Sequence, residues 1–586
     1  MIVLSGAALL ALAKDEQTPP ATDENKMKPV AVISIASYDR IMSSIAYIGK
    51  LSNNPELDKN LEGMLKLFTQ GQGVNGLDRT RPLGAAVSTD GMQFQPLVFV
   101  PVVKLQQLLD SLAPIAAIGE AKDIGNGVFE LQNENMKLYV KEQSNWAFIA
   151  QVPESLANLP KDPSKLLGGL DTRYEVALRL HVQNIPDMYR TFVIDQIKAG
   201  VESGLERKED EEDAQYELRK KQIENQVQSM VTAINETDRL TVGWKLDQDK
   251  NISYVDLRVT ALPNTKSARQ FAAVTKTRSR YTGFLVPDAA VTVNFAADIP
   301  KEDITQAGTM LEAFQAAAME EIAQQDKLPD DATRKLAQEV VGELLGAVRA
   351  TLDKGRADGG GAVVLDNHKL AVIAGGFVAD PQAVERALHK VDKLAKEKDP
   401  KFPGVQFDAD KHGDVRFHTL SIPITEKKEA VRLLGDPVQL AVGIGSDSVY
   451  LAFGADSLPK LKGVIDKSKS SGNKPVLPMQ LSLALRPILE FAAAMEKQKA
   501  ADNGDPVANG EDEEADQGAQ AGNSRHMVLE ALAAEVAKSE GKDHVRVTAH
   551  PIRNGMLYRL LAEEGVLKLL GQAGKLTGAG MPIGPQ

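Results

Sequence analysis

One pattern occurs twice in this chain, and the repetition constrains its architecture more than any other feature of the 586 residues. The segment Met136–Lys161 aligns without a gap with Val438–Gly463, which places Trp146 opposite Ser448 (448 − 146 = 302). Seven of the following eight aligned pairs are identities: Leu138/Leu440, Val140/Val442, Ser144/Ser446, Phe148/Tyr450, Ala150/Ala452, Ser155/Ser457, Leu156/Leu458 and Leu159/Leu461. Self-similarity at one long offset is typical of repeated structural units. We therefore predict a tandem duplication.

The order of the predicted elements also recurs. Residues 176–183 alternate between apolar and polar side chains, and residues 479–486 repeat the alternation (479 − 176 = 303). A period of two with one apolar side predicts a half-buried strand in a one-sided sheet. Each unit opens on a strand, at 30–36 and 291–297, and helical stretches follow, at 38–51 and 55–68 in the first unit and at 301–323 and 331–352 in the second. Strands and helices mix without strict βαβ alternation, which predicts α+β units, each with a mainly antiparallel sheet covered by helices on one face.

The repeat divides the chain near residue 285. Each unit has a charged insertion after its alternating strand: 206–221 is compatible with a helix, and 500–523 is rich in Gly, Asp and Glu. Such composition favours a disordered loop over a weak polyanionic cation site. The predicted parts are a signal peptide at 1–13, a disordered spacer at 14–28, a first unit at 29–285, a second unit at 286–577 with a disordered insertion at 500–523, and a loose tail at 578–586.

The N-terminus indicates export. Ile2–Ala13 is an apolar run that ends in Ala11-Leu12-Ala13 before Lys14, as in a cleaved secretory signal, although no basic residue precedes it. The alternative is a buried or frayed N-terminal helix. The run is shorter than the roughly 20 residues of a membrane-spanning helix. We expect a periplasmic or secreted protein with no transmembrane segment after cleavage.

Charge and cysteine content exclude several classes of function. The net charge of −12 argues against nucleic-acid binding, which needs a basic surface to displace counterions. The chain has no cysteine, which excludes disulfides, thiolate metal sites and a cysteine nucleophile. The expected partner is an unknown protein or an apolar ligand.

One loop has weak metal-binding character. In 408–414, carboxylates at alternate positions with a glycine at the sixth resemble a calcium loop. The pattern breaks at its fifth position, which is histidine, and at its twelfth, where Thr419 replaces the glutamate. A solvated hairpin turn is the alternative interpretation. The candidate ligands are Asp408, Asp410, His412 and Asp414.

Other motifs fail for definite reasons. Gly443–Ser448 lacks the third glycine of a dinucleotide loop, and Asp358–Gly361 lacks the Lys-Ser/Thr of a phosphate loop. The eight histidines form no HExxH pair, and no Gly-x-Ser-x-Gly elbow occurs. We predict no catalytic residues and no cofactor.

The segments Pro153–Leu159 and Ala455–Leu461 follow strand pairs at the same place in each unit. With the repeated order of elements, this resembles large exported proteins of planctomycete-type bacteria. The resemblance implies export but no activity and no site residues.

The leading hypothesis is an exported, non-enzymatic protein with a binding, envelope-structural or assembly role. The second is a periplasmic carrier of lipid or another apolar ligand, and the third is a hydrolase or metal enzyme.

Overall fold

The computed structural model describes residues 27–51, 54–116, 121–132, 137–208, 211–324, 330–366, 369–424, 428–503 and 526–570. The predicted signal peptide, residues 14–26 of the spacer, residues 504–523 of the insertion and the tail lie outside this part. The chain groups into two compact units. The first runs to Ile194 and adds Ile234–Leu262 and the stretch from Arg559, whereas the second holds Asp195–Ala233 and Pro263–Tyr558. This grouping differs from a single boundary at residue 285.

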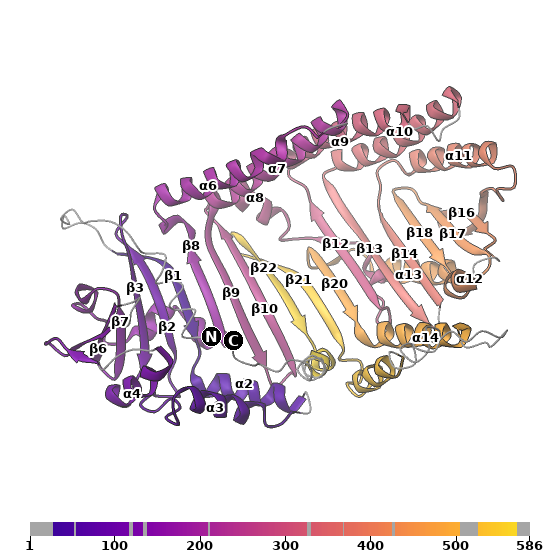
Figure 1. Cartoon of the computed structure of the whole chain (residues 1–586). Helices are drawn as coiled ribbons and strands as arrows, with labels where there is room; N and C mark the ends of the chain where they lie inside the picture. The colour runs from indigo at the N-terminus through magenta and orange to yellow at the C-terminus, as the bar shows by residue number, and fades with distance from the viewer. Residues whose placement is uncertain are drawn as a thin grey trace, which may run out of the picture. The chain divides into compact units, whose positions relative to one another are not determined.

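The first unit contains an antiparallel sheet, seen on the indigo-to-magenta side of Figure 1. Its strands pair in the order β4-β5-β6-β7-β3-β2-β1-β8-β9-β10. They are β1 (Lys28–Ile35), β2 (Leu83–Thr89), β3 (Phe94–Pro101), β4 (Lys122–Asp123), β5 (Val128–Gln132), β6 (Lys137–Gln143), β7 (Trp146–Ala150), β8 (Val176–His181), β9 (Thr237–Asp247) and β10 (Ile252–Ala261).

The antiparallel strands of the second unit, which we call the second sheet, pair in the order β15-β16-β17-β18-β14-β13-β12-β20-β21. A short pair, β11 (Arg278–Ser279) with β19 (Lys474–Pro475), stands apart, and β22 (Gly555–Ala562) begins in this unit and ends in the first. The main strands are β12 (Val291–Asp298), β13 (Arg356–Asp366), β14 (Lys369–Phe377), β15 (Gln406–His412), β16 (Val415–Ile422), β17 (Val438–Ile444), β18 (Ser448–Gly454), β20 (Met479–Ala484) and β21 (His544–Ile552).

Three of the helices begin at a side-chain cap, namely α8, α10 and α11. Asp330 and Asp380 accept the backbone N–H of Thr333 and Ala383, as N-cap residues do. The helices are α2 (Tyr38–Leu51), α3 (Leu57–Phe68), α4 (Leu105–Ala116), α5 (Leu170–Arg173), α6 (Asp187–Glu202), α7 (Asp213–Glu236), α8 (Lys266–Ala273), α9 (Lys301–Gln324), α10 (Asp331–Asp353), α11 (Pro381–Lys398), α12 (Lys428–Leu434), α13 (Ser457–Ser471), α14 (Leu485–Asn503), 526–537 and 564–570. The predicted α+β class with a mainly antiparallel sheet is confirmed.

The two sheets share strand order and register. In the first, a row of direct partners crosses β7, β3, β2, β1 and β8; in the second, a row crosses β18, β14, β13, β12 and β20. The rows are Ile149–Val98–Ala85–Ile33–Leu178 and Leu451–Ala374–Gly361–Val293–Leu481. Each row begins at the sequence offset of 302 (451 − 149) and ends at the offset of 303 (481 − 178). The aligned segments at offset 302 and the alternating strands at offset 303 are thus joined by the same strand pairings in both units.

Each sheet has one face that carries the core, which we call the core face. In the first unit, Val32 and Ala177 are buried on this face under residues 153–173, which we call the cover segment. In the second unit, α13 contacts β14 and β18, and the core includes Ala362 and Ile373. The opposite face of each sheet, which bears Ile33 and Leu178 or Val293 and Leu481, we call the open face.

Candidate functional site

The predicted metal loop forms a row of ion pairs. Residues 408–414 lie along β15 and its turn, and their side chains meet separate partners. Asp410 pairs with Lys462, Asp414 pairs with Lys469, and His412 Nε2 lies 2.7 Å from Asp466 Oδ1. All three partners lie on α13. Hydrogen bonds from the two lysines lower the pKa of Asp410 and Asp414. These three side chains hold the hairpin to the helix and do not converge on one point.

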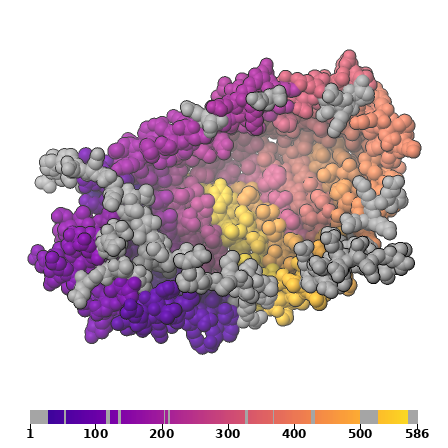
Figure 2. All heavy atoms as spheres, viewed as in Figure 1, coloured from indigo at the N-terminus to yellow at the C-terminus, as the bar shows by residue number. Residues whose placement is uncertain are grey.

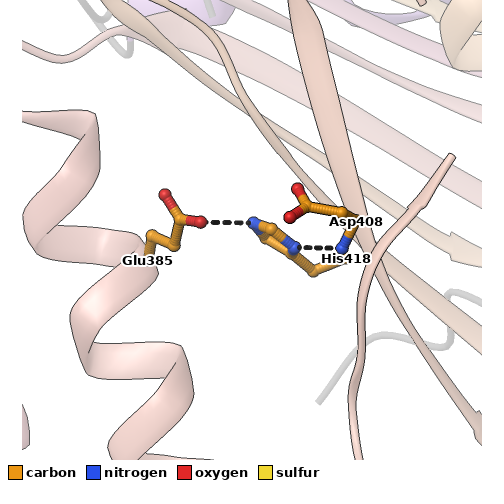
Figure 3. A group of neighbouring side chains, drawn as sticks. All are labelled: Glu385, Asp408 and His418. Carbon is orange, nitrogen blue, oxygen red and sulfur yellow. Dashed lines mark hydrogen bonds and ion pairs between the residues drawn. The ribbon is translucent and has the colours of Figure 1, made fainter. Parts of the chain in front are cut away.

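Asp408, the fourth candidate, belongs to a different group with Glu385 and His418 (Figure 3). His418 is 1% exposed; its Nδ1 accepts the backbone N–H of Asp408 at 3.0 Å, and its Nε2 lies 3.4 Å from Glu385 Oε1. No ligand spacing among the eight histidines pointed to His418.

The tautomer of His418 argues against a metal at this group. Because Nδ1 accepts a backbone N–H, the neutral ring carries its proton on Nε2, and neither nitrogen has a free lone pair. Arg416 donates to both carboxylates, at 2.6 and 2.9 Å to Glu385 and at 2.9 Å to Asp408. Burial lowers the pKa of His418, which keeps the ring neutral. The group is a neutralised charge network, and the residues do not fit a cation.

A half-open recess of about 760 Å³ lies on the core face of the second unit. Cross-strand neighbours Thr292, Ser482 and Arg546 contribute to its lining. At its rim, Arg486 donates to Glu490 at 2.7 Å, and the Arg486 backbone N–H donates to Asp543 at 2.7 Å. Its charges are therefore largely satisfied within the protein.

The open face of the first sheet carries a continuous apolar surface. Strands β1, β8, β9 and β10 place three rows of direct partners on it, and every position is apolar. The one polar atom in these side chains, Trp244 Nε1, donates to Ser253 at 2.9 Å. The rows are Ile35–Val176–Trp244–Val255, Ile33–Leu178–Val242–Leu257 and Ala31–Leu180–Leu240–Val259.

This face is exposed at its centre. Leu178 is 37% exposed, Val242 and Val255 39%, and Leu257 36%. Figure 2 looks onto this face and shows the surface hollowed between α2–α3 and α6. Helix α6 also exposes apolar side chains, among them Phe192. Monomeric soluble proteins seldom expose contiguous apolar patches above a few hundred Å², and larger ones mark binding sites.

The open face of the second sheet has the same character. Three rows across β21, β20, β12, β13, β14, β18 and β17 contain only apolar residues and glycine. Phe295 is 43% exposed and Leu451 is 39% exposed. The rows are Val545–Leu483–Val291–Val363–Val372–Phe453–Leu440, Val547–Leu481–Val293–Gly361–Ala374–Leu451–Val442 and Ala549–Met479–Phe295–Gly359–Gly376–Val449–Ile444.

The alternation at residues 176–183 predicted a half-buried strand, but it did not show which side of the strand is buried. Residues 176–181 form β8, yet Ala177 is 2% exposed while Leu178 is 37% exposed. The more polar side of the strand therefore faces the core, and the apolar side faces outward. Nothing in one strand distinguishes a covered apolar face from an open one.

Among the described residues, no helix is both long enough and apolar enough to cross a membrane. No family model, no curated protein and no solved structure matches this chain.

Proposed function

We propose that this protein is an exported, non-enzymatic binding protein whose open faces hold the hydrocarbon chain of a lipid. The observation that carries the proposal is the uninterrupted apolar surface of β1, β8, β9 and β10, with Leu178 and Leu257 exposed at its centre. Covering such a surface is favourable, because removing apolar area from water contributes about 25 cal/mol of free energy per Å².

The chemistry of the face favours an acyl chain over a protein partner. Protein interfaces carry roughly one hydrogen bond per 100–200 Å² and are enriched in aromatic residues and arginine. The three rows present aliphatic side chains, one tryptophan with its N–H already satisfied, and no free donor or acceptor. An acyl chain needs none, and each buried methylene contributes about 0.8 kcal/mol.

Two further inferences accompany the proposal. The apolar run at residues 2–13, which ends in Ala11-Leu12-Ala13, supports export to the periplasm or beyond. The shared strand order, together with the linked offsets of 302 and 303, supports an origin of the two sheets by tandem duplication. N-terminal sequencing of the protein from fractionated cells tests export: a new N-terminus near residue 14 in the exported fraction is expected.

A fluorescent fatty acid tests the binding. We expect the full chain to bind a dansylated long-chain fatty acid with a blue shift in emission, and the Leu178→Lys/Leu257→Lys variant to bind at least tenfold more weakly. Both leucines are more than one-third exposed, so their replacement leaves the core intact. Native mass spectrometry of freshly purified protein should show co-purifying lipid that the variant lacks.

The control is Met92→Lys, which adds one lysine at an apolar side chain 63% exposed in the turn between β2 and β3. It should bind the probe like the wild type. Absence of binding by the wild type, or equal binding by the double variant, would refute the proposal. A wild-type dimer that the double variant converts to monomer would assign the face to a second copy of the chain instead.

A further inference from the structure

The core face of the first sheet carries a row of arginines beyond its apolar part. Arg179 on β8 and Arg258 on β10 stand on either side of Thr241 on β9, because the pairing of the three strands places them in one row. With neighbouring strands about 4.8 Å apart, the backbones of the two arginines lie roughly 10 Å from each other. Two long side chains on one face at this separation reach a common point.

A third arginine approaches from the cover segment. Arg173 ends α5, and the next residue, Tyr174, packs on β9 so closely that a Cβ on Gly243 would lie 2.5 Å from its Cγ. Gly168 of the cover segment also approaches the row, since a Cβ there would lie 2.8 Å from Arg179 Nη1. The segment thus closes one side of the site.

These arginines lack acidic partners in the described part of the chain. Arg179 Nε donates only to Thr241 Oγ1 at 3.4 Å, and Arg258 Nε is buried without a partner. The next carboxylate along β10, Asp256, is already held by Arg559. Burial first, and then the charges of Arg239, Arg173 and Arg258, lower the pKa of Arg179. Three positive charges accumulate here in a chain whose net charge is −12.

We propose that Arg173, Arg179 and Arg258 form an oxyanion site that binds a phosphate ester. A guanidinium group presents two parallel N–H donors that match two oxygens of one anion. A phosphate monoester offers three terminal oxygens and close to two negative charges, which suits three arginines better than the two oxygens and single charge of a carboxylate. The hydroxyl of Thr241 supplies a further donor in the centre of the row.

The site is independent of the proposed lipid-binding face, because Arg179 and Leu178 point to opposite sides of β8. It also belongs to one sheet only. The register of the second sheet places Ser482 where the first has Arg179, and Arg546 where the first has Thr241. The anion site therefore distinguishes the two copies of the fold.

Calorimetry and thermal melting of the full chain with inorganic phosphate test the proposal. We expect phosphate to bind and to raise the melting temperature more than chloride at equal ionic strength. The Arg179→Gln/Arg258→Gln variant should lose at least tenfold in affinity. Without phosphate at low ionic strength it should melt above the wild type, because repulsion between like charges is removed.

The matched control is Arg553→Gln, which removes one positive charge in the exposed turn between β21 and β22 and should bind phosphate like the wild type. If the double variant does not fold, Arg258→Lys replaces it. This variant keeps the positive charge but loses the two parallel N–H donors of the guanidinium group, so it should bind phosphate several-fold more weakly than the wild type. Competition by glycerol 3-phosphate identifies a free ester, and competition by vesicles with phosphatidic acid, but not phosphatidylcholine alone, identifies a lipid headgroup. Equal effects of phosphate and chloride on the wild type, or undiminished phosphate binding by the double variant, overturn the proposal.

Discussion

Asp256 is a carboxylate in the interior of the first unit, and its neighbours donate hydrogen bonds to both of its oxygens. Its side chain is 3% exposed. Arg559 donates to both oxygens, at 2.7 and 2.9 Å, while its guanidinium group lies 3.8 Å from the centre of the Tyr254 ring. Tyr174 donates its hydroxyl to the same carboxylate at 3.0 Å. Burial, followed by the charge of Asp256, raises the pKa of Tyr174 to about 12, so this hydroxyl remains a donor at all ordinary pH values.

We therefore predict that Asp256→Ala lowers the free energy of unfolding of the first unit by about 3–5 kcal/mol, because Arg559 is left partly buried without its anion. The matched change Asp247→Ala breaks a pair with Lys250, which is 72% exposed, and should cost less than about 1 kcal/mol. Both tryptophans of the chain, Trp146 and Trp244, lie in the first unit, so urea unfolding followed by tryptophan fluorescence reports on it. Equal losses in the two variants would contradict the prediction.

At the scale of elements, each sheet has a strand glycine on which a residue of the covering segment packs closely. In the first unit, a methyl group on Gly84 of β2 would lie 2.6 Å from Leu167 Cδ2. In the second, a methyl group on Gly360 of β13 would lie 2.7 Å from Phe284 Cβ. The shared register places these two glycines at the same position of β2 and β13. Leu167 and Phe284 are both fully buried, so neither can move aside without opening the core.

The consequence is that Gly84→Ala should destabilise the first unit by about 1–3 kcal/mol, since overpacking forces buried neighbours out of place. Gly63→Ala is the matched control: Gly63 lies within α3, no atom stands within 4 Å of its added methyl group, and alanine is the better helix former by about 0.5–1 kcal/mol. Urea unfolding monitored by tryptophan fluorescence should shift in opposite directions for the two variants. A shift of the same sign and size in both variants would contradict the prediction, because it would show that the cover segment moves to make room for the methyl group at Gly84.

At the scale of the whole molecule, local patterns predict more of the fold than of the site. The helices predicted at 38–51 and 331–352 appear as α2 and α10, and alternation located β8 and β20. The open faces escaped prediction because Leu178 alternates in the same way whether its side is covered or exposed. The arginine site escaped because Arg179 looks like any polar residue on a strand, and its neighbours come from β9, β10 and α5. The ion pairs of Asp410 and Asp414 escaped prediction because their lysine partners lie 52 and 55 positions away in the chain.

The division of the chain into units leads to a prediction about cutting it. Arg559 groups with the first unit although 303 positions separate it from Asp256, so a fragment of residues 29–285 contains the buried carboxylate without its partner. We expect this fragment to unfold at lower urea concentration than the full chain, by tryptophan fluorescence, and to recover when it is co-expressed with residues 286–586. Asp256→Asn supplies the decisive control, because its effect on stability should have opposite signs in the full chain and in the fragment. In the full chain it breaks the pair with Arg559 and destabilises, whereas in the fragment it removes an unpaired buried charge and stabilises. A fragment as stable as the full chain, or the same sign of the Asp256→Asn effect in both, would show that the first unit is complete before residue 286.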